Sequence, residues 1–120
     1  MTKGQIEAQI SEAIIKFEKE YMGRGPIETK TFIINDMILI RLKGVLTPAE
    51  VQLAKASDGA DLIKKTRARL LENARCLLET IIYNITGCNV TSLHSDISTK
   101  NGERIIIFVL NKNLEENIDN

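Results

Sequence analysis

The stretch ADLIKKTRARLLENARCLLETIIYNITG, residues 60–87, decides the fold. Apolar side chains recur along it at steps of three, four and seven residues without an interrupting proline, which predicts one long amphipathic helix that Gly87 ends. At 1.5 Å per residue this helix would be about 40 Å long, whereas a compact chain of this size is about 35 Å across. The helix must therefore bend, or one end must project and be covered by a second chain. The apolar positions are Ile63, Leu70, Ala74, Leu77, Ile81 and Ile85, and the same stripe is widened by Leu71, Leu78 and Ile82.

The composition is that of one globular domain over residues 1–120, with a polar tail from about residue 111. Apolar residues make up 43% of the chain and tryptophan is absent, so the core must be built from Ile, Leu and Val. The 16 basic and 16 acidic residues cancel, which removes any global attraction to nucleic acid or to an anionic membrane. No apolar run approaches the roughly 20 residues that cross a bilayer. Two cysteines, Cys76 and Cys88, are too few for a disulfide framework and indicate a reducing cytoplasm.

The first part of the chain predicts a helix followed by a hairpin. Residues 3–22 place apolar side chains every three or four residues, as one face of a helix requires. Residues 29–43 hold two β-rich runs around Asn35-Asp36, a pair that tolerates the positive φ of a tight turn. The predicted apolar face of the helix consists of Ile6, Ile10, Ile14, Phe17 and Tyr21.

Two further signals lie on either side of the long helix. Thr47-Pro48-Ala49-Glu50 is a capping box with proline at the first helical position, so a short helix begins there and ends near residues 57–59. After the long helix, Asn101-Gly102 predicts a hairpin turn between strands 89–98 and 103–110.

Both hairpins are predicted to join in one antiparallel sheet with helices on one face, because a single hairpin is marginal alone. Strand 103–110 is apolar on both faces, which favours a central place in that sheet. A two-residue turn would set Ile97 opposite Ile106 and would place Cys88 and Val90 on the other face. The predicted fold class is α+β in the order α-ββ-α-α-ββ, with the sheet packed against the long helix.

Gly23-Arg24-Gly25-Pro26 is the first candidate binding site. Its two glycines free the backbone amides and Arg24 can grip a phosphate or carboxylate, with Arg67 and Arg69 of the long helix lining the same site. The stretch lacks the long glycine loop and the lysine of a P-loop. The alternative is a helix stop that redirects the chain.

His94 and Asp96 are a candidate polar pair, because residues two apart on a strand point to one face and a carboxylate can orient an imidazole for proton transfer. No nucleophile accompanies them, and a surface or interface pair is the alternative. With Cys76 and Cys88 they would form a zinc set, but no Cys-x-x-Cys spacing is present, which favours small buried cysteines and no metal site. No residues support a catalytic assignment.

The first half of the long helix is basic. Such a cluster can bind nucleic acid or an acidic partner, but no aromatic residue lies nearby for stacking. A solvated helix face or salt bridges between subunits are therefore favoured over a nucleic-acid partner. The basic residues are Lys64, Lys65, Arg67, Arg69 and Arg75.

In their order and spacing, these motifs resemble a bacterial family named after MpsC, a proposed component of a sodium-translocating, membrane-potential-generating system. The resemblance extends from the first helix to Leu110. It implies a small cytoplasmic protein, not established as catalytic, that is associated with a transport system. The resemblance rests on the residues and motifs Gly23-x-Gly25-Pro26, Leu46-Thr47-x-x-Glu50, Gly59, Arg67, Arg69, Thr86-Gly87-x-x-Val90, Asp96 and Phe108-Val109-Leu110.

The sequence thus supports two functional hypotheses. The first, which rests on the resemblance, is a cytoplasmic non-catalytic accessory or regulatory protein with a membrane-protein partner. It would act as a homo-oligomer, most simply a dimer, because the apolar stripe of the long helix exceeds what one small sheet covers. The second is a small-ligand or anion-binding module built on the Gly-Arg-Gly-Pro turn and the helix arginines. Neither hypothesis invokes a cofactor, a metal, nucleic acid or insertion into a membrane.

Overall fold

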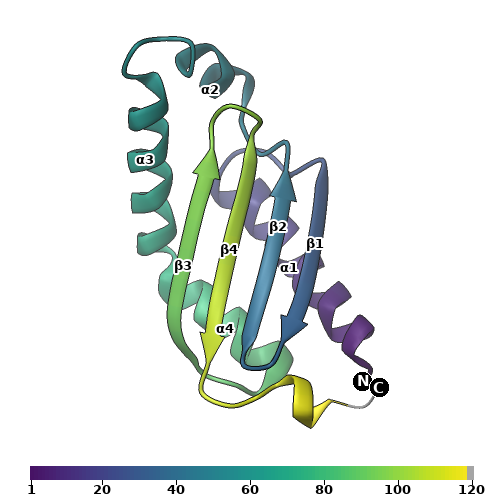
Figure 1. The fold of residues 1–120 in the computed structure, drawn as a ribbon. Helices are drawn as coiled ribbons and strands as arrows, with labels where there is room; N and C mark the ends of the chain where they lie inside the picture. The colour runs from purple at the N-terminus through teal and green to yellow at the C-terminus, as the bar shows by residue number, and fades with distance from the viewer. Residues whose placement is uncertain (119–120) are drawn as a thin grey trace.

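The computed structural model describes residues 1–118 and shows a four-stranded antiparallel sheet with α1 and α4 crossing behind one face (Figure 1). The α+β class and the order α-ββ-α-α-ββ are confirmed. A short 3₁₀ turn, η1, follows the last strand. The elements are α1 (Lys3–Tyr21), β1 (Glu28–Ile34), β2 (Met37–Lys43), α2 (Pro48–Leu53), α3 (Gly59–Asn73), α4 (Arg75–Thr86), β3 (Val90–Ser98), β4 (Glu103–Leu110) and η1 (Glu115–Asn117).

The strand order is β1-β2-β4-β3, so β4 is central, as its two apolar faces predict. The first hairpin turns at the predicted two residues, where Asn35 has a φ of 55° and Ile34 pairs with Met37. The second hairpin joins the first because β2 pairs with β4, with Ile40 opposite Ile106. Each strand therefore presents alternate residues to the core and to the outer face of the sheet.

The core lies between the sheet and helices α1 and α4. Ile10, Ile14 and Phe17 of α1 are buried there, as predicted. Tyr21, predicted on the same face, is instead exposed and stacks on Phe17 with ring centroids 5.1 Å apart. The chain after β4 returns to the core, because Leu114 is buried.

The helix is not continuous, because the chain bends at Ala74; of the two outcomes that its length allowed, a bend or a projecting end, the structure has the bend. This residue has φ −93° and ψ 4°, and its N–H is shared between the carbonyls of Leu70 and Leu71 at 3.1 Å each. Helix α3 ends at Asn73 and α4 begins at Arg75. The bend lets α3 lie beside β3 while α4 turns beneath the sheet (Figure 1).

Within the predicted apolar stripe, the side that holds Leu71, Leu78 and Ile82 is the buried one. Leu70 and Leu77, two of the positions predicted to be covered, are exposed. The buried side chains follow steps of three and four residues and bring a charged group inward at Arg67. One chain therefore covers most of the apolar surface that the sequence assigned to a second chain. The buried positions are Ile63, Arg67, Leu71, Ala74, Leu78 and Ile82.

The predicted register of the second hairpin is wrong by two residues. The strands are joined by residues 99–102, not by two residues, and Ile97 pairs with Arg104. A shift of two preserves the face of each side chain, so Ile97 is still buried. A β-bulge after Val90 reverses the alternation there, and Cys88 is consequently buried in the core.

Candidate functional site

Four charged side chains meet on the helix side of the sheet and form a buried ion cluster, consisting of Glu18, Glu50, Arg67 and Arg104. Glu18 is fully buried, and Arg67 and Arg104 are each 2% exposed. The four residues come from α1, α2, α3 and β4, so the cluster joins elements that are remote in the sequence. Burying a charge is costly unless the group is paired and hydrogen-bonded. A charged group in this cluster that lacks a hydrogen-bond partner therefore needs a physical explanation.

Arg67 is the best-satisfied member of the cluster. Its Nε and Nη2 donate to the two carboxylate oxygens of Glu50 at 2.8 and 2.7 Å, and Nη2 also donates to the Val45 carbonyl at 2.9 Å. The Thr47 N–H donates to the same carboxylate at 2.9 Å, which completes the predicted capping box. Burial acts to raise the pKa of Glu50, but the hydrogen bonds from Arg67 and Thr47 outweigh it and lower that pKa. The box that starts α2 thus also fixes the counter-ion of Arg67.

Glu18 and Arg104 are poorly satisfied. The Glu18 oxygens lie 3.7 Å from Nη1 of Arg67 and 3.8 Å from Nη1 of Arg104, and neither oxygen accepts a hydrogen bond within residues 1–118. Burial raises the pKa of the Glu18 carboxyl against the opposing effect of Arg104 and Arg67. Burial also lowers the pKa of Arg104, whose Nε donates to Ser95 Oγ at 3.2 Å. Within the described chain, Nη1 of Arg104 is buried without a hydrogen-bond partner, and so is Nη1 of Arg67.

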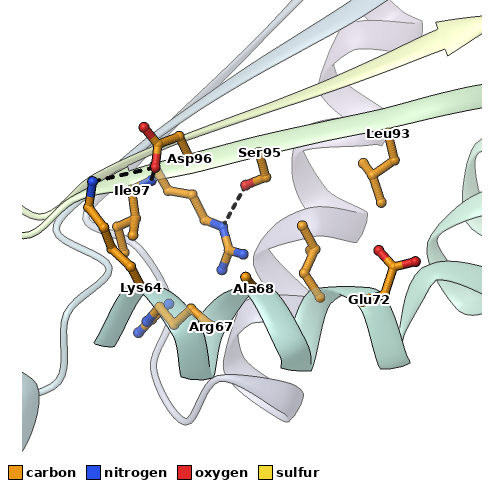
Figure 2. Close-up of a pocket in the computed structure, with 10 residues that line it drawn as sticks. Lys64, Arg67, Ala68, Glu72, Leu93, Ser95, Asp96 and Ile97 are labelled. Atoms are coloured by element: carbon orange, nitrogen blue, oxygen red, sulfur yellow. Dashed lines mark hydrogen bonds and ion pairs between the residues drawn. The ribbon is translucent and has the colours of Figure 1, made fainter. Parts of the chain in front are cut away.

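A crevice of about 210 Å³ lies between α3 and β3 and reaches Arg104. Figure 2 shows Lys64, Ala68 and Glu72 along the helix facing Leu93 and Ser95 along the strand. At one side, Lys64 Nζ lies 3.7 Å from the carboxylate of Asp96, whose side chain is 83% exposed. The residues that line this α3–β3 crevice are Lys64, Arg67, Ala68, Leu71, Glu72, Leu93, Ser95, Asp96, Ile97 and Arg104.

The α3–β3 crevice combines an apolar wall with cationic donors. Ala68, Leu71 and Leu93 supply the wall, and Lys64 and Arg104 supply positive charge. Its volume is below the roughly 300–1,000 Å³ of pockets that hold drug-sized ligands. The arrangement therefore suits a small molecule with an anionic group.

The structure distributes the residues of the predicted anion site over separate places. Gly23, with a φ of 86°, follows the end of α1 and redirects the chain. Arg24 donates to the Leu46 carbonyl at 3.3 Å, and Arg69 borders a shallow depression on α3. Arg67 alone lines the α3–β3 crevice. The predicted set was Gly23, Arg24, Gly25, Arg67 and Arg69.

The predicted polar pair is exposed on β3. His94 Nε2 lies 3.2 Å from Ser92 Oγ, whereas Asp96 accepts from the Ile97 N–H at 2.9 Å and pairs with Lys64. No hydrogen bond or ion pair between His94 and Asp96 is present in residues 1–118. In the same part of the chain, no three His, Cys, Asp or Glu side chains gather closely enough to hold a metal ion.

Sequence reasoning missed Glu18 and Arg104, although both carried a signal. Glu18 follows Ile14 by four residues and so continues the apolar stripe of α1. Arg104 alternates with Ile106 and Phe108, which places it on the core face of β4. A charged residue in phase with an apolar pattern is the sign that would have found them.

The outer face of the sheet is a second candidate surface, because none of the helices in residues 1–118 covers it (Figure 1). Phe32 is 43% and Ile34 41% exposed, and the other apolar residues of this face are half-buried by one another. Leu39 at its centre pairs with both Phe32 and Ile107. A contiguous apolar patch on a small protein commonly marks an interaction site. The open sheet face consists of Phe32, Ile34, Met37, Leu39, Ile105, Ile107 and Val109.

The comparison with known families identifies the chain. Residues 2–112 match the family described as "Na+-translocating membrane potential-generating system (MpsC)". The chain belongs to the MpsC family. That match spans every helix and strand from α1 to β4, so the resemblance seen in the sequence motifs is confirmed.

Two relatives of this MpsC-family chain come from Bacillus subtilis (strain 168). The uncharacterized protein YbcI is 45% identical over 118 residues, which cover 98% of this chain and 95% of YbcI. The uncharacterized protein YrhF is 23% identical over 109 residues, which cover 90% and 89% of the two chains. No solved structure matches the chain. Within residues 1–118, no helix is both long enough and apolar enough to span a membrane.

Proposed function

We propose that this chain is a cytoplasmic, non-catalytic accessory or regulatory protein of a sodium-translocating, membrane-potential-generating system, and that it acts as a homodimer. The match of residues 2–112 to the MpsC family carries the first part of the proposal. The open sheet face supports the second part. The free thiols of Cys76 and Cys88 suit a reducing compartment.

A second copy of this chain suits the open sheet face. Two sheets can pack face to face about 10 Å apart, and a two-fold axis brings the same patch against itself. The rim carries both signs of charge, since Arg41 pairs with Glu103 at 2.7 Å and Lys43 with Glu28 at 3.4 Å. The chain has no net charge, so long-range repulsion does not oppose self-association. The proposed interface thus lies on the sheet and not on the helix stripe.

Sedimentation velocity over a range of concentrations tests the dimer. We expect a species of twice the 13.4 kDa chain mass for the wild type. Phe32→Lys buries an unpaired charge in the interface and should weaken dimerisation by about tenfold or more. Leu77→Lys is the matched control, because Leu77 is 38% exposed but lies on α4, away from the open sheet face. A wild type that stays at 13.4 kDa, or dissociation caused by Leu77→Lys alone, would contradict the proposed interface.

A potential-sensitive dye tests the association with the membrane system. Cells that lack the gene should generate a smaller sodium-dependent membrane potential than wild-type cells. Expression of the wild-type chain or of Leu77→Lys should restore the potential, whereas Phe32→Lys should not. An unchanged potential in the deletion strain would refute the accessory role. Loss of rescue by Leu77→Lys would refute the role of the sheet face.

A further inference from the structure

Arg104 is the less satisfied of the two buried arginines, because it makes one hydrogen bond where Arg67 makes three. It is 2% exposed, its Nε donates to Ser95, and its Nη1 is buried without a hydrogen-bond partner. A guanidinium has five N–H donors in a planar fork that fits a carboxylate or a phosphate. Unmet donors inside a protein are destabilising, so their retention beside a crevice points to a ligand or to ordered water.

The other charges around the α3–β3 crevice lie closer to their counter-ions than Arg104, whose paired carboxylate oxygen is 3.8 Å away. Glu72 lies 3.5 Å from Arg75, and the Asp96 carboxylate lies 3.7 Å from Lys64. Arg67 holds Glu50 by two hydrogen bonds. The carboxylate paired with Arg104 is that of Glu18, which Arg104 shares with Arg67. Glu18 accepts no hydrogen bond from either arginine. Arg104 therefore retains the capacity to bind an incoming anion.

We propose that the α3–β3 crevice binds a small anion that carries a carboxylate or phosphate group, held by the Arg104 guanidinium with Lys64 and Ser95 as further donors. The volume of about 210 Å³ limits the ligand to a few heavy atoms beyond the anionic group. Any apolar part of that ligand lies against Leu71 and Leu93. This site is independent of the open sheet face and goes beyond the accessory function.

NMR titration of the ¹⁵N-labelled chain tests the proposal with inorganic phosphate and acetate as the probes. Ionic strength is held constant with sodium chloride, so that general screening does not change. At least one probe should give saturable shifts of the backbone amides of Lys64, Ala68, Ser95 and Ile97. Which of the two saturates at lower concentration identifies the anionic group that the site prefers.

Variants distinguish binding of the anion in the crevice from nonspecific attraction of the anion to positive charge on the surface. Lys64→Gln should weaken binding by about fivefold, the upper range for a partly exposed charge pair. Lys65→Gln is the matched control, because Lys65 is the next residue of α3, pairs with Asp61 and does not line the crevice. Arg104→Lys keeps the charge but loses the planar fork, and should weaken binding by about tenfold or more.

If Arg104→Lys does not fold, Ser95→Ala replaces it, because it removes the hydrogen bond that orients the guanidinium. Three results would overturn the proposal. These are shifts that do not saturate with either probe, equal weakening by Lys64→Gln and Lys65→Gln, or unchanged affinity in both Arg104→Lys and Ser95→Ala. Ordered water alone would then fill the crevice. None of these results bears on the dimer, which sedimentation measures.

Discussion

Replacing Arg67 by methionine should be among the most damaging single changes in this protein. The substitution keeps most of the side-chain volume and removes three hydrogen bonds, two to Glu50 and one to the Val45 carbonyl. It also leaves the fully buried Glu18 with Arg104 as its one remaining cation in the described chain. Removing one partner of a buried ion pair costs about 3–5 kcal/mol. Because Glu50 is partly exposed and water can solvate it, we expect a loss near the lower value, about 3 kcal/mol.

That loss is large against a total stability of about 5–15 kcal/mol for a domain. At about 4 °C per kcal/mol, Tm should fall by about 12 °C. Urea unfolding followed by far-UV circular dichroism measures the change, with equal m-values required for the comparison. Arg69→Met is the matched control, because Arg69 is exposed on the same helix and its replacement should cost less than about 0.5 kcal/mol.

The pairing can be isolated with a double-mutant cycle. If Arg67 acts through Glu50, the double variant Arg67→Met with Glu50→Gln should lose clearly less stability than the two single variants combined. Additive losses, or an Arg67→Met protein within about 1 kcal/mol of the wild type, would refute the view that the buried ion cluster holds α1, α2 and α3 together.

Three further predictions concern titration, packing and thiol reactivity. Burial raises the pKa of Glu18 in the folded protein above its ordinary value of 4.5. The wild type should therefore lose stability relative to Glu18→Gln as the pH rises from 4.5 through the folded-state pKa. Urea unfolding measures both proteins across this pH range, and a constant difference in stability between them would contradict the prediction. Gly59→Ala should lower the stability by at least about 2 kcal/mol, because the added Cβ would lie 1.7 Å from a backbone oxygen of α2. Gly4→Ala is the control: an added Cβ there meets no atom within 4 Å, so the same measurement should show a neutral or slightly stabilising change. Ellman's reagent should modify the exposed Cys76 rapidly and the buried Cys88 only when the protein opens, and equal rates would show that the core around α4 is looser than described.

Much of the architecture could be predicted because its causes are local. The capping box at Thr47 and Glu50 forms within four residues, and the turn at Asn35 needs only a tolerated positive φ. The residues of β4 are apolar on both faces of the strand, which is why its central position was predictable. Family membership, too, followed from motifs that the chain carries in order.

The candidate site was less predictable, because its parts meet only through the fold. Arg67 was predicted as an anion-binding residue on the helix, but its partners come from α1, from α2 and from the loop before α2. Arg24 and Arg69, predicted beside it, lie elsewhere because the loop after α1 turns toward Leu46 and because Arg69 is on the outer side of α3. Side-chain direction on a helix depends on which stripe the rest of the protein covers.

By itself, the sequence determined the α+β class, the element order, the central strand and the family, since periodicity, caps and turns act between near neighbours. The tertiary structure alone decided that the chain bends at Ala74, that the second hairpin shifts by two residues, and that Glu18 and Arg104 share the core. The physical reason is that these features depend on packing between elements that are remote in the sequence, which no local pattern sets. A helix long enough to project from its own domain folds back instead, because one sheet and two helix segments bury its apolar side chains more completely than a straight rod would.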